Sequence, residues 1–189
     1  LPFLVELFLA LVITDIFQYW THRIFHSHHY LWRFHSVHHS IQNMDWLAGS
    51  RIHFIDIFFT RSISYIPLYV LGFSSLTFNT YIVFIAVHAV LIHANTNIHF
   101  GVFKYIITTP QYHHWHHCKE PEHYGKNLAV VFPFIDKLFG TYHLPGNEWP
   151  KGTGLVDASF PKGFWKQLIF PFSKNPFDND LPPEEKSKR

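Results

Sequence analysis

The sequence predicts an all-α fold: an integral membrane helical bundle whose cytosolic, histidine-rich helical cap holds a dinuclear metal site. Three observations support this prediction. The chain of 189 residues contains three apolar stretches of about the length that a bilayer crossing requires. Only 15% of its residues are charged, whereas about 25% is typical of soluble domains. Its histidines recur at spacings that place several rings on one face of a helix.

The three apolar stretches are predicted to be transmembrane helices at about residues 1–21, 53–71 and 76–93. No lysine or arginine precedes Arg23, and none lies in the short turn at residues 72–75. The basic residues gather instead on the histidine-rich side, which the positive-inside rule places in the cytosol. They are Arg23, Arg33, Arg51, Lys104 and Lys119. The first residue is Leu, so we expect the chain to be a slice of a longer protein.

Of the charged residues inside the predicted spans, Asp15 and Arg61 in particular should have a partner or a task. Asp15 shares a helical stripe with His22 and His26, at spacings of seven and eleven residues. It is expected either to orient a metal-binding imidazole or to pair with a basic group of another helix. Arg61 lies near the middle of the second span, where it is expected to snorkel or to meet Asp15, Glu6 or Asp56.

Three histidine motifs carry the chemistry of the chain. His113, His116 and His117 form His-x2-His-His, and His35, His38 and His39 repeat this spacing. His22 and His26 lie one helical turn apart. Chance clustering is the alternative, because 17 of 189 residues are histidines, but three such motifs would rarely arise by chance. Imidazole suits iron, zinc, copper and nickel, and eight rings exceed what one tetrahedral ion takes, so at least two ions are expected.

The order of these motifs resembles the fatty acid hydroxylase/sterol desaturase superfamily of integral membrane oxygenases. The resemblance covers about residues 17–144 and includes the stretches 31–39, 51–56, 92–95 and 136–142. It implies a dinuclear centre, usually di-iron, held by histidines. His53 and His93 match further family positions, with His88 and His99 in reserve. The predicted metal ligands are His22, His26, His35, His38, His39, His53, His93, His113, His116 and His117, and no catalytic residue beyond them is predicted.

This resemblance also implies a domain organisation and a location. Residues 1–145 are predicted to form the membrane hydroxylase/desaturase domain. Residues 146–189 should form a C-terminal loop, an interfacial segment near residues 164–170 and a disordered tail from residue 174. A bacterial inner membrane or the endoplasmic reticulum is the expected location, with the active site on the cytosolic side. The net charge of +2 and the scattered basic residues do not indicate nucleic-acid binding.

The function implied is an O2-dependent di-iron membrane oxidoreductase that hydroxylates or desaturates a lipid C–H bond of the sterol, fatty acyl or carotenoid type. Electrons should come from an external donor of the cytochrome b5 or ferredoxin type, because the chain has no flavin, nicotinamide or haem fingerprint. One alternative is a membrane zinc hydrolase on the same histidine scaffold, since zinc also accepts imidazole and is a candidate metal in the isolated protein. The other alternative is a non-catalytic membrane protein that binds or transports metal.

Overall fold

The computed structural model describes residues 1–156 and 160–173, and all regular elements in this part of the chain are helical. The α-helices are α1 (Phe3–Ser27), α2 (His29–His39), α3 (Phe54–Val70), α4 (Ser75–His93), α5 (Pro110–His116), α6 (Pro133–Phe139) and α7 (Phe164–Ile169). The described residues contain no strand, only an isolated bridge between Cys118 and Thr153. The predicted all-α class is therefore confirmed for this part of the chain.

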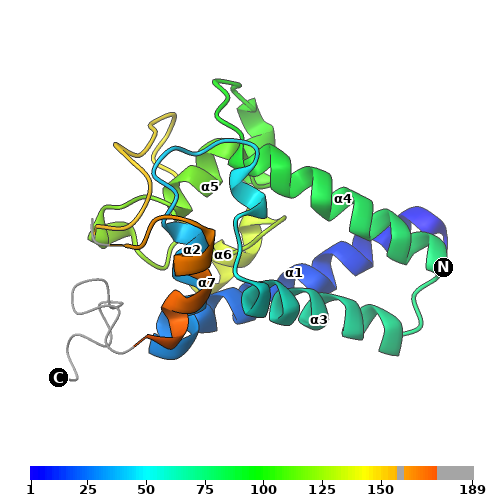
Figure 1. Ribbon diagram of the computed structural model, residues 1–189. Coiled ribbons are helices and arrows are strands. Elements are labelled where there is room, and N and C mark those ends of the chain that lie inside the picture. The colour runs from blue at the N-terminus through cyan, green and yellow to red at the C-terminus, as the bar shows by residue number, and fades with distance from the viewer. Residues whose placement is uncertain (157–159, 174–189) are drawn as a thin grey trace.

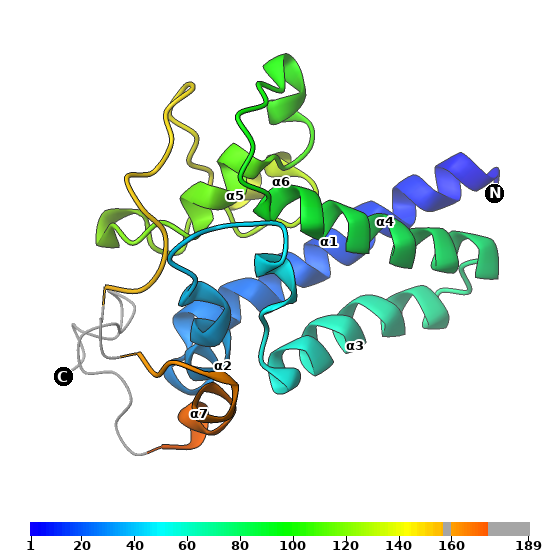
Figure 2. The same ribbon diagram turned by 45° about the horizontal axis from the view of Figure 1, so that its top comes forward.

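The long helices α1, α3 and α4 run together toward one end of the molecule, as Figures 1 and 2 show. The N-terminus and the α3–α4 turn lie at that end, whereas α2, α5, α6 and α7 gather at the other end. A core between these helices contains Ala10, Leu68, Tyr81 and Ile85. The bundle thus has an end built only from long helices and a broader end built from short ones.

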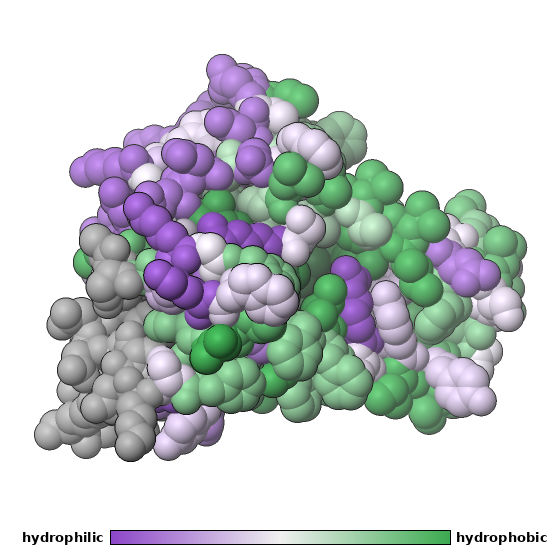
Figure 3. Space-filling model, viewed as in Figure 1, coloured by the Kyte–Doolittle hydropathy of each residue, from purple (hydrophilic) through white to green (hydrophobic). Residues whose placement is uncertain are grey.

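Apolar side chains cover much of the outer surface of the three long helices, as the large hydrophobic area in Figure 3 shows. Exposed examples are Phe8 and Phe17 on α1, Phe58 on α3, and Val83 on α4. Two helices, α1 and α4, are long and apolar enough to cross a membrane. The third predicted span is helical as α3, but its 17 residues extend only about 26 Å. That each of the three helices crosses a membrane stays a prediction.

Glu6 joins α1 to the start of α4 at the narrow end of the bundle. Its carboxylate accepts hydrogen bonds from the backbone amide and the hydroxyl of Ser74, at 2.5 and 2.9 Å. Ser74 in turn caps α4 through its hydroxyl. Among the described residues no lysine or arginine lies within ion-pair distance of a carboxylate, so Arg61 meets none of its three predicted acidic partners and the snorkelling alternative stays a prediction.

Asp15 has a different role from both predicted ones. Its carboxylate accepts hydrogen bonds from the backbone amides of Val130, Val131 and Phe132, at 2.8, 3.1 and 2.6 Å. Asp136 binds the amides of Leu128 and Ala129 in the same loop. Two buried carboxylates therefore hold the irregular segment 128–132 in place. They accept hydrogen bonds from backbone amides that this segment would otherwise leave unsatisfied.

Replacing Asp15 by asparagine is expected to lower the free energy of unfolding by about 1–3 kcal/mol. The amide keeps the shape but turns an N–H group toward a backbone donor, so at least one buried N–H loses its acceptor. The midpoint of thermal unfolding in detergent measures the effect, with exposed Glu122→Gln as the control. Equal midpoints for the wild type and Asp15→Asn would contradict this account of the loop.

The C-terminal segment packs against α2 and the start of α3. The Arg33 guanidinium donates to the carbonyls of Pro171 and Ser173, and the ring of Phe34 meets that of Phe172. Phe164 and Trp165 on α7 are exposed, as expected of an interfacial segment. The predicted disordered tail lies outside the described residues, and the proposed division of the chain at residue 145 stays a prediction.

Candidate metal centre

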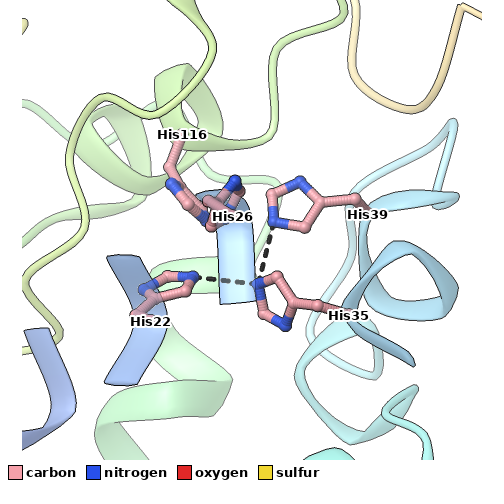
Figure 4. A group of neighbouring side chains, drawn as sticks. All are labelled: His22, His26, His35, His39 and His116. Carbon is pink, nitrogen blue, oxygen red and sulfur yellow. Dashed lines mark hydrogen bonds between the residues drawn. The ribbon is translucent and has the colours of Figure 1, made fainter. Parts of the chain in front are cut away.

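Nine histidine rings converge where the ends of α1 and α4 meet α2 and α5. They form two groups, and within each group the candidate ligand atoms lie within 4.8 Å of one another. Figure 4 shows the larger group, with rings from α1, α2 and α5. The five-histidine group contains His22, His26, His35, His39 and His116. The four-histidine group contains His38, His93, His113 and His117.

Each His-x2-His-His motif is divided between the two groups. On α2, His35 and His39 enter the five-histidine group and His38 enters the other. Around α5, His116 enters the five-histidine group, while His113 and His117 enter the other. Residues four apart share one face of a helix, and the remaining ring of each motif turns toward the neighbouring group.

The two groups are immediate neighbours. The rings of His39 and His117 belong to different groups, yet they stack with their centroids 4.3 Å apart. The rings of His38 and His39 are 5.7 Å apart on the same helix. The arrangement therefore provides two adjacent histidine groups, each of which could hold a metal ion.

Backbone and carboxylate acceptors fix the tautomer of five rings. The Nδ1 atom of His22 lies 2.8 Å from the carbonyl oxygen of Leu128, and that of His35 lies 2.7 Å from Asp56 Oδ2. A neutral ring that donates from Nδ1 leaves a lone pair on Nε2, the atom that faces the group. The other three contacts join His38 to the Arg51 carbonyl, His93 to the Ala89 carbonyl and His116 to the Lys126 carbonyl.

These tautomers bring lone pairs face to face. The Nε2 atoms of His22 and His35 are 2.9 Å apart, and those of His38 and His93 are 3.2 Å apart. When all four rings are neutral and donate from Nδ1, both Nε2 atoms of each pair carry lone pairs, which repel at this distance unless a cation lies between them. A metal ion bound by both nitrogens would remove that repulsion. The donor set therefore fits bound metal.

Burial keeps the rings outside the spans neutral. It is the largest cause that lowers the pKa of His116, to about 3, and that holds the pKa of His117 well below the usual histidine range. The Nε2 atoms of His26 and His116 and the Nδ1 atom of His117 are buried without a hydrogen-bond partner. Neutral imidazoles with unpaired buried nitrogens are suited to bind metal ions without competition from protons.

His53 does not join either group, so its predicted place in the ligand set is not supported. Its Nδ1 atom accepts from the amide of Ile55 and caps α3, at 3.2 Å. Its Nε2 atom then donates to the carbonyl of Leu168, at 3.1 Å. Both nitrogens have protein partners. The reserve residues lie apart too: His88 bonds to Thr108 and the Val130 carbonyl, and His99 is exposed.

The fatty acid hydroxylase family model matches residues 7–141, which include all nine converging histidines. The chain belongs to this family. An ornithine lipid hydroxylase, OlsE, from Rhizobium tropici is 36% identical over 92% of this chain and 52% of its own length. An alkylglycerol monooxygenase from Danio rerio is 32% identical over 71% of the chain and 30% of its own length.

A methylsterol monooxygenase from Arabidopsis thaliana is 24% identical over 72% of the chain and 46% of its own length. The chain thus spans about half or less of these relatives. No solved structure gives a significant match. The superfamily that the motif order predicts is confirmed, and these three relatives are a lipid hydroxylase and two monooxygenases by name.

Asp56 contacts the candidate metal centre of this fatty acid hydroxylase family member, and the sequence did not reveal this role. It lies three residues after His53, at the end of the family-like stretch 51–56, and was otherwise considered only as one of three possible partners of Arg61. In the structure it is buried on α3 and accepts from the Nδ1 atom of His35. A carboxylate in this position fixes the ring and raises its basicity as a ligand.

Replacing Asp56 by asparagine is expected to weaken metal retention by about 10–100-fold. The amide can turn its oxygen toward His35, so the ring keeps its orientation but loses the negative charge behind it. Equilibrium dialysis against a metal buffer measures the change, and Asp45→Asn in an exposed loop is the control. Unchanged metal retention would mean that Asp56 only supports the fold.

Proposed function

We propose that this chain holds the catalytic centre of a membrane lipid hydroxylase that uses two iron ions. The overall reaction would be R–H + O2 + 2 e⁻ + 2 H⁺ → R–OH + H2O. The ions, when bound, supply the reductive activation of O2 that this reaction needs. The observation that carries the proposal is the pair of adjacent all-histidine groups at the broad end of an apolar helical bundle.

The number of ligands in one group disfavours a tetrahedral zinc site. The five-histidine group offers five imidazole nitrogens, one more than a tetrahedral zinc ion takes. Among the described residues neither group includes a carboxylate to act as a hydrolytic base, which also disfavours the zinc hydrolase.

The protein contributes positioning, neutrality and dryness. Fixed Nδ1 donors hold the rings in place before any ion arrives, so little reorganisation accompanies binding. His39, His116 and His117 are almost fully buried, which keeps bulk water away from the centre. Nine neutral ligands leave the positive charge of both ions uncompensated, and this makes the centre strongly electrophilic.

The substrate is proposed to be a lipid that enters from the bilayer, because apolar side chains cover the long helices beside the centre. Hydroxylation is favoured over desaturation by the relatives, a hydroxylase and two monooxygenases by name. The proposed electron donor is a separate protein of the cytochrome b5 or ferredoxin type. The proposed location is a bacterial inner membrane or the endoplasmic reticulum, with the centre facing the cytosol.

Lipid extracts from cells that express the intact protein test this function. Compared with cells that express His116→Ala, one lipid class should gain a single oxygen atom by mass spectrometry. Growth under ¹⁸O2 should place the heavy isotope in that product. A product that forms equally in both cell lines, or that takes its oxygen from water, would refute the proposal.

A further inference from the structure

A cavity of about 380 Å³ opens beside the five-histidine group. Three rings of that group, His26, His39 and His116, form part of its wall, and in the view of Figure 4 they lie on the side away from His22 and His35. No ring of the four-histidine group lines it. Its volume is at the lower end of the range of small-molecule sites, about 300–1,000 Å³.

The wall of this cavity combines apolar and cationic groups. Its apolar lining comes from the aromatic and aliphatic side chains Trp32, Leu128, Phe139 and Leu155. Arg23 and Lys126 also line it, and none of its lining residues is acidic. A site with apolar walls, two cations and no carboxylate is complementary to an amphiphile that carries a negative charge.

Arg23 is held in a defined position at this wall. One of its guanidinium N–H groups donates to the hydroxyl of Tyr19 at 3.0 Å, and the group lies over the Trp20 ring at 5.5 Å. Tyr19 is fixed in turn by Thr141, whose hydroxyl donates to Asp136. A guanidinium has five N–H donors, so four remain for a ligand such as a phosphate or a carboxylate.

Lys126 is linked directly to the metal centre through its backbone. Its carbonyl oxygen accepts from the Nδ1 atom of His116 at 2.9 Å. Its side chain is half-buried, and no carboxylate pairs with its ammonium group within the described ranges. Because Lys126 and His116 line the same cavity, an anion bound there by Lys126 would share the cavity with the five-histidine group.

Basic residues at a membrane face are commonly explained by the positive-inside rule and by loose attraction to anionic lipids. Two observations go beyond that explanation. Both cations share one cavity with three candidate metal ligands, and the direction of the Arg23 side chain is fixed by Tyr19 and Trp20. Such an arrangement is suited to bind a specific group rather than a diffuse layer of lipid.

We propose that Arg23 and Lys126 bind the oxyanion of an amphiphilic lipid, either a phosphate or a carboxylate, and hold it in this cavity against the five-histidine group. That this lipid is also the substrate rests on the proposed function, whereas its binding in the cavity does not. The two residues would then determine which head groups the protein accepts. Neutral amphiphiles of equal chain length should bind more weakly, because they leave both cations without a counter-charge.

Binding to purified, zinc-loaded protein in a neutral detergent tests this proposal without iron, O2 or turnover. The probes are a monoacyl glycerophosphate, an N-acyl amino acid and a neutral monoacylglycerol of the same chain length. Tryptophan fluorescence follows binding, since Trp32 lines the cavity. At least one anionic probe should bind about tenfold more tightly than the neutral one. Preference for phosphate, for carboxylate or for both supports the proposal and identifies the head group.

The variants Arg23→Gln and Lys126→Gln should each remove most of this preference, and Arg23→Lys should keep part of it. Lys119→Gln is the matched control, because Lys119 is exposed and lies outside the cavity. If Arg23→Gln fails to fold, Lys126→Gln decides alone. Equal binding of all three probes, or full preference in the Gln variants, would overturn the proposal. If the anionic probe binds preferentially but the lipid extracts contain no oxygenated product, the proposed function is refuted and the binding proposal stands.

Discussion

Replacing His116 by alanine is expected to remove one of the two metal ions and to reduce hydroxylated product by at least about 100-fold. Mutating a residue that only hydrogen-bonds to a metal ligand reduces metal affinity or activity by up to about 100-fold. His116 is itself a proposed ligand, so its loss should have at least that effect. Its Nε2 atom is buried without a protein partner and faces the other rings of the five-histidine group. Metal analysis after gel filtration should give about one ion per chain.

His113→Ala provides the reciprocal test, because this ring belongs to the four-histidine group. It should also retain about one ion per chain, and the double variant should retain none. His99→Ala is the control, since that ring is exposed and outside both groups. Two ions in His116→Ala would show that His116 is not a ligand. No ion in either single variant would show that the groups do not bind independently.

The helical spacing of the histidines predicted which rings would gather but not how they would divide. His35, His38 and His39 were expected to share one face, yet His38 belongs to a different group from the other two. Spacing along one helix sets the direction of a ring, whereas the partner ring comes from another helix. Only the packing of α2 against α1 and the position of α5 decide that partner.

His53 and Asp15 share a role in the structure that the sequence pattern did not suggest. Each residue lies where the sequence pattern suggested a role at the metal centre, but in the structure its side chain accepts hydrogen bonds from backbone amides instead. His53 caps the start of α3, and Asp15 binds three amides of the loop at 128–132. A sequence shows no such loop, because irregular segments have no periodic pattern. Asp56, by contrast, performs the supporting role that had been considered for Asp15.

Removing the metal ions is expected to lower the midpoint of thermal unfolding by more than about 5 °C. The shift reflects binding free energy that the folded state alone gains, and structural sites of this kind contribute several kcal/mol. Without a cation, facing lone pairs such as those of His22 and His35, 2.9 Å apart, repel each other. Chelation followed by a thermal scan measures the shift, and added ferrous iron should reverse it.

Acid should destabilise the metal-free protein further, and the direction follows from the buried rings. Burial is the largest cause that lowers the pKa of His116 to about 3 and those of His38, His39, His113 and His117 well below the usual range. The unfolded chain, with ordinary histidine pKa values near 6.5, therefore binds more protons than the folded chain below that pH.

Stability is thus fully present above about pH 6.5 and is lost as the pH falls from there toward 3, by about 1.4 kcal/mol per pH unit for each ring that stays neutral when folded. Denaturant unfolding of the metal-free protein between pH 7 and 5 measures this slope. Replacing exposed His99 by alanine should leave it unchanged, whereas His113→Ala should reduce it by about one proton. A flat profile would mean that water reaches the rings and that the dry centre proposed for oxygen chemistry does not form.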